Sequence, residues 1–170
     1  MAMEKILVPL DGSDLAEAAL ETAIDILRER PTTTLLLVRA AESESARSAE
    51  LDVIADKARA VRAAESYLNG VAAGLRECGI TGVRTAVWYG AAAPTIVEVA
   101  ATEKVDLIIM TSHGRGGAGR MIFGSVAESV LHGTRIPILL VRDVTAPVQP
   151  LLGASEPSAT QRENVPTARP

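Results

Sequence analysis

The sequence predicts an α/β fold: a doubly wound, five-stranded parallel sheet with helices on both faces. Short runs of consecutive apolar residues, typical of parallel strands buried on both faces, alternate with segments of helical periodicity. Because crossovers between parallel strands are right-handed, the order β-α-β-α-β-α-β-α-β leads to this architecture. The length of 170 residues, 48% of them hydrophobic, suits one domain that buries its own core.

Five segments are expected to form the strands. The central ones are Lys5 to Leu10, Thr34 to Val38 and Asp106 to Met110. In residues 83–88 apolar and more polar positions alternate, which predicts a strand at an edge of the sheet. Ile138 to Val141 supplies the fifth strand.

Four helices are expected between these strands. Asp14 and Glu17 form a capping-box-like start for the first helix, which ends at Pro31. An apolar stripe from Ile54 to Leu75 marks the second, which ends near Gly79.

Pro94 suits the first turn of the third helix, which carries Ile96 inward. Ser125 and Glu128 form a capping box for the fourth helix, which closes at Gly133. The whole is a Rossmann-like single domain.

Two segments fall outside these elements. Ala40 to Asp52 is rich in Ser, Glu and Ala and is expected to be a mobile connection. The end of the chain contains more than half of the prolines and too few apolar residues to offset an ordering entropy of about 1–2 kcal/mol per residue. We therefore predict a folded domain over residues 1–143 and a flexible, Pro-rich tail over 144–170.

Composition excludes several classes of function. Aromatic residues make up 2% of the chain, too few for platforms that stack successive bases or sugar rings, and the net charge of −4 offers no field that gathers DNA or anionic membranes. The single cysteine, Cys78, forms no internal disulfide and is expected to be a packed, inert thiol. Without a recognisable signal peptide or an apolar run near the roughly 20 residues of a membrane span, we expect a cytoplasmic protein.

The loop after the fourth strand, residues 111–120, favours phosphate binding. Its glycines are Gly114, Gly116, Gly117 and Gly119. Missing side chains let backbone N–H groups approach an anion, and Arg115 adds positive charge. The helix that starts at Gly124-Ser125 contributes free N–H groups and its positive dipole end. A flexible glycine hinge with solvated arginines is the alternative interpretation.

Two familiar nucleotide motifs nearly match this loop and are rejected. Gly114, Gly116 and Gly119 have the spacing of the dinucleotide fingerprint, but no helix opens directly there and the acidic residue about 20 positions further on is missing. Gly114 and Gly119 also have Walker A spacing, but Arg120 and Met121 stand where Lys and Ser or Thr are required.

Several separated motifs resemble the universal stress protein family. They are Ile6 to Ser13, Gly90 to Ile96, Asp106 to Gly114, Gly124 to Glu128 and Pro137 to Val141. The resemblance covers roughly residues 3 to 143, so the predicted domain is a universal stress protein nucleotide-binding domain. ATP-binding members share the pattern Gly-x2-Gly-x9-Gly-Ser/Thr. Gly114 and Gly124-Ser125 match it, whereas Thr111 replaces the first glycine.

The resemblance implies a site for ATP, or for ADP or AMP, with Mg²⁺ accompanying the nucleotide. The residues implied at the adenosine end are Pro9, Asp11, Val38 and Met110. Those implied around the ribose and phosphates are Gly114, Arg115, Gly116, Gly117, Gly124, Ser125 and Val126. From the residues alone, Asp11 equally suits a local hydrogen bond to its own turn. Ser13 is assigned to helix entry and His113 to bracing the loop, and neither a catalytic residue nor a protein-held metal is assigned.

The leading functional hypothesis is an ATP-binding regulatory or stress-response module with at most slow ATP hydrolysis. The resemblance implies a homodimer paired through Ile138 to Val141, whose edge is otherwise open to aggregation. The alternative is a nucleotide-independent dimeric interaction protein, which Thr111 keeps open. A third class, an adenylate-forming or nucleotidyl-transferring enzyme, needs further acidic or lysine groups and a substrate domain for which the chain has no room.

Overall fold

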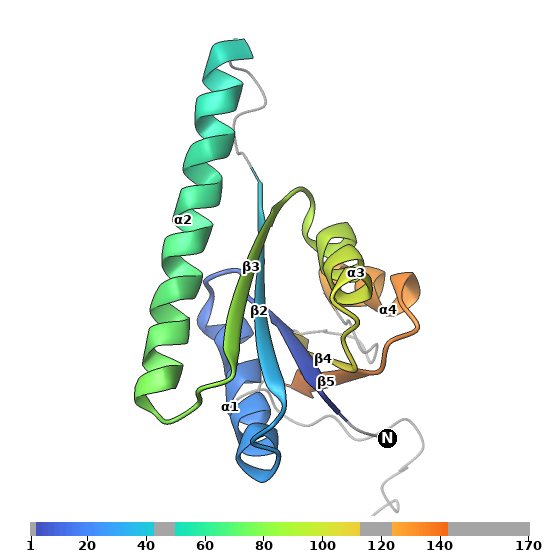
Figure 1. The fold of residues 1–170 in the computed structure, drawn as a ribbon. Helices are drawn as coiled ribbons and strands as arrows, with labels where there is room; N and C mark the ends of the chain where they lie inside the picture. The colour runs from blue at the N-terminus through green and yellow to red at the C-terminus, as the bar shows by residue number, and fades with distance from the viewer. Residues whose placement is uncertain (1–2, 43–49, 113–123, 143–170) are drawn as a thin grey trace, which may run out of the picture.

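The computed structural model describes residues 3–42, 50–112 and 124–142, and within these ranges strands and helices alternate in the predicted order (Figure 1). The strands are β1 (Lys5–Pro9), β2 (Thr34–Ala41), β3 (Val83–Tyr89), β4 (Leu107–Ser112) and β5 (Ile138–Arg142). The helices are α1 (Asp14–Glu29), α2 (Glu50–Glu77), α3 (Ala92–Thr102) and α4 (Ser125–Gly133).

All neighbouring strands pair in parallel, in the order β3-β2-β1-β4-β5. The winding direction reverses between β1 and β4, which makes the sheet doubly wound and confirms the predicted fold class. β3 lies at one edge, as its alternating pattern predicted, and β5 lies at the other.

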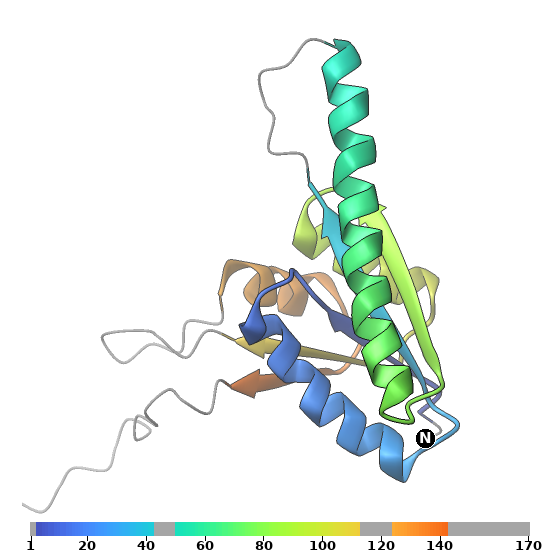
Figure 2. The ribbon, with the colours of Figure 1, turned by 90° about the vertical axis from the view of Figure 1, so that its left-hand side faces the viewer.

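The helices form two layers, α1 and α2 against one face of the sheet and α3 and α4 against the other (Figures 1 and 2). Alternation along the strands supplies a core to each layer. In β1, the side chains of Ile6 and Val8 pack on the α1 and α2 side, whereas Leu7 packs on the α3 and α4 side, and all three are fully buried. Consecutive apolar residues therefore reflect burial on both faces.

Both predicted capping boxes are wrong by one residue. Ser13, not Asp14, is the N-cap of α1, and its Oγ accepts a hydrogen bond from the Ala16 N–H at 3.1 Å. Glu17 instead accepts a bond from the Tyr67 hydroxyl. α4 begins with Gly124 at the N-cap position and has no side-chain cap.

The connection expected over Ala40 to Asp52 is shorter than predicted, because β2 continues to Ala41 and α2 already begins at Glu50. α2 extends past the end of the sheet (Figure 1), so Ile54, predicted to face inward, is 68% exposed. Cys78, expected to be packed, is also exposed, because it follows the last residue of α2. The predicted tail lies outside the described residues, as does the segment 43–49.

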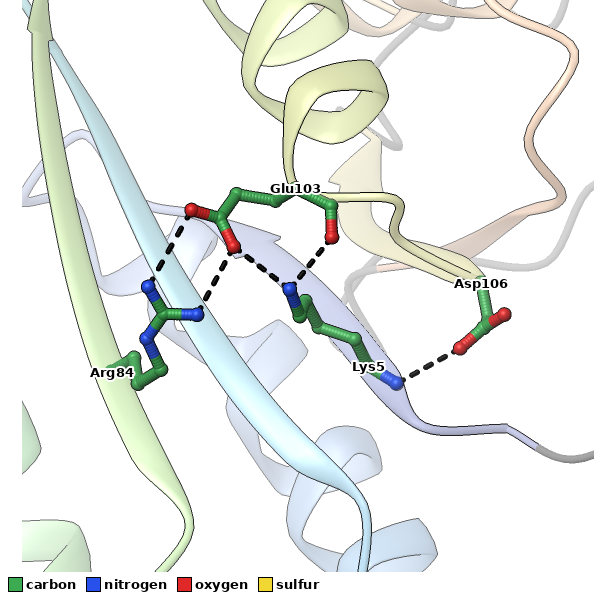
Figure 3. A network of polar contacts seen from close by, with 4 residues as sticks. All are labelled: Lys5, Arg84, Glu103 and Asp106. Atoms are coloured by element: carbon green, nitrogen blue, oxygen red, sulfur yellow. Dashed lines mark hydrogen bonds and ion pairs between the residues drawn. The ribbon is translucent and has the colours of Figure 1, made fainter.

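A polar network closes the amino end of the sheet (Figure 3). The Asp106 carboxylate accepts the backbone N–H groups of Glu4 and Lys5 at 2.8 and 2.9 Å. Glu103 accepts hydrogen bonds from the Lys5 ammonium at 2.8 Å and the Arg84 guanidinium at 3.0 Å. These contacts join β1 and β3 to the turn between α3 and β4, far from the strand ends at which parallel sheets bind ligands.

No helix in the described part of the chain is both long enough and apolar enough to cross a bilayer.

Candidate functional site

A pocket lies at the carboxyl end of the sheet, where the winding direction reverses between β1 and β4. Its volume is about 190 Å³, several times the ~30 Å³ that one water molecule occupies in the liquid. The described wall residues come from the ends of β1, β2 and β4 and from the starts of α1, α3 and α4. Ligand sites of open α/β sheets occur in this position.

Many residues that the sequence assigned to the site lie together in this wall. They are Pro9, Asp11, Val38, Met110, Gly124, Ser125 and Val126. The others, Gly114, Arg115, Gly116 and Gly117, lie outside the described residues. Thr111, which departs from the family pattern, also lines the pocket at the end of β4.

The apolar part of the pocket follows from strand alternation. Val38 and Met110 belong to the core on the α3 and α4 side, so their side chains share one face of the sheet. The Leu10 N–H donates to the Val38 carbonyl at 2.8 Å, which continues the pairing of β1 with β2 into the β1–α1 turn. The turn that carries Asp11 is thereby fixed beside Val38.

Three helices begin at the pocket, and they differ in charge. α1 is capped by the Ser13 hydroxyl and carries Asp14 and Glu17 in its first turn. Among the described residues, the N-caps of α3 and α4 provide no side-chain cap; α3 has no acidic residue in its first turn, α4 has one, Glu128, and Gly124 at the start of α4 has φ 53° and ψ 144°. Free N–H groups and the positive dipole end make an uncapped helix start attractive to anions. The α4 side of the pocket therefore favours an anion more than the α1 side does.

Asp11 makes the local hydrogen bonds that its position in a β–α turn predicts. Its Oδ1 accepts the Ser13 N–H at 2.9 Å and the Ser13 hydroxyl at 2.6 Å. Partial burial raises the pKa of Asp11, but the Ser13 hydrogen bonds and the charge of Arg39 outweigh it, so the pKa lies below its ordinary value. The carboxylate is ionised at neutral pH and is the acidic group in the described wall.

Sequence reasoning missed part of the wall. The additional residues include Leu15, Ala16, Ala40, Ala92 and Ile96. Ala40 and Ala92 could have been found from their positions in the sequence. Ala40 is near the end of a predicted strand and Ala92 follows another, and residues at the carboxyl ends of parallel strands and in the turns that follow them converge on one end of the sheet.

Comparison with known proteins agrees with this architecture. The model of the universal stress protein family matches residues 3–142. A universal stress protein of Methanocaldococcus jannaschii is 30% identical over 142 residues, which are 82% of this chain and 82% of that protein.

Solved structures resemble the chain over nearly their whole length. The structure of hypothetical protein MJ0577 has a TM-score of 0.71 and 27% identity, covering 84% of this chain and 98% of that one. A universal stress protein in complex with cAMP has a TM-score of 0.63 and 25% identity, covering 83% of this chain and 98% of that one. On the family match and these relatives together, the chain belongs to the universal stress protein family.

Proposed function

We propose that the chain is an ATP-binding regulatory protein of the stress response, with ADP or AMP as further ligands of the same site. The observation that carries this proposal is the pocket at the switch point of the sheet, in whose wall separated motif residues meet. A similar universal stress protein has been solved in complex with cAMP, which supports an adenine nucleotide as the class of ligand.

The chemistry of the wall suits the two ends of a nucleotide. Val38, Ala40 and Met110 offer apolar contacts to a purine, and no aromatic ring is needed for such packing. The Asp11 carboxylate disfavours a phosphate at the α1 side but suits a ribose hydroxyl. The uncapped start of α4 at Gly124 and Ser125 suits the phosphates. We propose that Mg²⁺ accompanies the phosphates and is held mainly by phosphate and water oxygens, because Asp11, the carboxylate of the described wall, lies on the α1 side.

Binding is proposed to change a conformational or assembly state, and we assign no catalytic residue. A homodimer through β5 is part of this proposal. β5 is an edge strand, and Leu139 on it is 39% exposed. The edge of β5 that pairs with no strand in the described part of the chain fits the same strand of a second copy. A cytoplasmic location is the compartment we propose for such a module.

A nucleotide-independent interaction protein is the second candidate, and Thr111 is the observation that favours it. Thr111 lines the pocket at a position where the family pattern has a glycine, and a β-branched residue in place of glycine stiffens the chain at the end of β4.

One experiment separates the two candidates. The protein is purified without added nucleotide, denatured, and the supernatant is analysed by ion-exchange chromatography for ATP, ADP and AMP. Calorimetric titration of nucleotide-free protein with ATP then gives the affinity. Retained adenine nucleotide, or saturable ATP binding at one site per chain, is the expected result. Neither retention nor binding would leave the interaction protein as the better description.

A further inference from the structure

Three polar side chains form a cluster on the face of the sheet opposite the pocket, behind the β1–α1 turn. The Arg39 cluster consists of Arg39 on β2, Tyr67 on α2 and Glu17 on α1. The Arg39 guanidinium lies over the Tyr67 ring, 4.7 Å from its centroid. The Tyr67 hydroxyl donates to Glu17 Oε1 at 2.6 Å. The cluster therefore joins one strand to both helices of this layer.

The Tyr67 side chain interacts favourably with both charged members of the cluster, through its hydroxyl with Glu17 and through its ring with Arg39. Burial raises the pKa of Tyr67, and the hydrogen bond to Glu17 raises it further, so the phenol keeps its proton and remains a donor. The positive guanidinium lies on the face of an electron-rich ring, which is a favourable cation–π arrangement. Since each member holds the next, the guanidinium has a defined position at the end of β2.

That position is directly against the β1–α1 turn. Gly12 has φ +90°, and a Cβ built on it would lie 3.2 Å from one terminal nitrogen of Arg39 and 3.6 Å from its Cζ. The left-handed backbone favours glycine at position 12, and a Cβ there would displace the end of the Arg39 side chain by a few tenths of an ångström, so the guanidinium lies close beside the turn. Asp11 and Ser13, which flank Gly12, both lie in the pocket wall.

Strand alternation explains how one residue serves the site without lining it. Val38 and Ala40 line the pocket, and Arg39 between them points to the other face, where it meets Tyr67. The turn is therefore bounded on two sides: the Leu10 N–H donates to the Val38 carbonyl, and the end of the Arg39 side chain lies beside Gly12.

We propose that Arg39 is a positioning residue of the nucleotide site: stacked on Tyr67, it braces the β1–α1 turn through Gly12 and so holds Asp11 in the pocket wall. The inference rests on the proposed function of the pocket. It assigns α2 a part in ligand binding although no residue of α2 belongs to the described pocket wall.

The first test needs no nucleotide. The Ser13 N–H, bonded to Asp11 Oδ1, reports on the turn, and its hydrogen exchange is followed by NMR. Arg39→Met is expected to accelerate this exchange by about 3- to 10-fold, the range of one partly exposed cation–π contact. Arg28→Met removes an exposed arginine from α1 as the matched control and should leave the exchange unchanged. Equal exchange in Arg39→Met and wild type overturns the brace.

The second test measures ATP affinity by calorimetry in a double-mutant cycle. Arg39→Met is expected to weaken ATP binding by roughly 3- to 10-fold in the wild-type background and by less than about twofold in the Asp11→Asn background, because it acts through Asp11. A structural role alone predicts the same loss in both backgrounds, and that result overturns the inference. Absence of ATP binding by the wild type refutes the proposed function instead, while the exchange measurement still decides whether the turn is braced.

Two milder variants keep the test decisive if Arg39→Met unfolds. Tyr67→Phe keeps the ring under the guanidinium but removes the hydroxyl bond to Glu17, and Arg39→Lys keeps the charge but loses the planar stack. For both variants, the exchange rate of the Ser13 N–H and the affinity for ATP are expected to lie between the values of the wild type and those of Arg39→Met. Wild-type values for both variants, measured on folded protein, contradict the proposal.

Discussion

Gly124 offers the sharpest test of the candidate site. A substitution there affects stability through backbone strain and affects ligand binding through the start of α4, and the two effects can be measured separately. With φ 53° and ψ 144°, Gly124 adopts a conformation that strains a residue with a Cβ by about 1–3 kcal/mol. At about 2–4 °C per kcal/mol for a chain of this length, Gly124→Ala is expected to lower Tm by roughly 2–12 °C. The protein should therefore still fold at 25 °C.

The effect on ATP binding is expected to be larger. If Gly124→Ala relieves the strain by turning the start of α4, the N–H groups of Ser125 and Val126 lose their aim at a phosphate. A hydrogen bond to a charged group is worth about 1.5–3 kcal/mol, so the loss of one bond weakens binding by roughly 10- to 150-fold. Calorimetric titration with ATP at 25 °C, below the unfolding transition, measures this loss.

Gly79→Ala is the matched control for backbone strain. Gly79 has φ +87°, and a Cβ there meets no atom within 4 Å, so the substitution adds strain without a collision. Gly79 lies shortly after the last residue of α2, at the end of the sheet where the strands begin, and it is not part of the described pocket wall. We expect a similar drop in Tm and an ATP affinity within about twofold of wild type. Equal losses of affinity in both variants, or none in Gly124→Ala, would refute the placement of phosphates at α4.

Three further predictions concern stability and assembly. Lys104 holds φ 53° at the left-handed position after α3, so Lys104→Gly should stabilise the protein by about 0.5–1 kcal/mol in thermal unfolding; a lower Tm contradicts this. Backbone hydrogen bonds from Lys5 and Glu4 hold the pKa of Asp106 below its usual 3.8, so its stabilising effect is present above that pH and is lost as pH falls through the lower folded-state pKa. Asp106→Asn should therefore destabilise the protein at pH 7 and progressively less as the pH is lowered below 3.8, measured by urea unfolding across this range, and an effect that does not change with pH excludes this cause. Leu139→Asp on β5 should give the monomer mass in light scattering, and a persisting dimer would place the interface elsewhere.

The sequence was sufficient for the order of the strands and helices, because burial on both faces of a parallel sheet leaves a simple pattern. It was insufficient for the two capping boxes, although the assignment of Ser13 to helix entry is confirmed, since Ser13 is the N-cap of α1. The stretch from Asp11 to Asp14 contains three residues that can cap a helix, and the choice of Ser13 depends on Asp11 accepting the Ser13 N–H. The stripe of α2 misled at Ile54 because helical periodicity continues past the point where the sheet ends.

Part of the candidate site can also be recognised from neighbouring residues in the sequence, whereas another part depends on contacts between residues far apart in the sequence. Pro9, Asp11 and Met110 were placed in the site by the resemblance to the universal stress protein family, and all three lie at the carboxyl ends of strands, where parallel sheets bind ligands. Arg39 was not, although it is adjacent to Val38, since its partner Tyr67 lies on another element and the contact depends on how α2 packs. Positioning residues of this kind leave no motif, because their spacing in the sequence is arbitrary.

The two ends of the sheet use polar groups in opposite ways, and this separates stability from binding. At the amino end, the carboxylates of Asp106 and Glu103 are paired with backbone N–H groups and with Lys5 and Arg84. At the carboxyl end, the N-cap residues Ala91 of α3 and Gly124 of α4 provide no side-chain cap among the residues that the structure describes, and the first N–H groups of a helix have no partner within the helix. β1, with its five residues, separates the ends by about 16 Å, beyond the ~10 Å within which substitutions usually couple. We therefore expect substitutions in the amino-end network to change the free energy of unfolding, and substitutions at the starts of α3 and α4 to change binding in the proposed site.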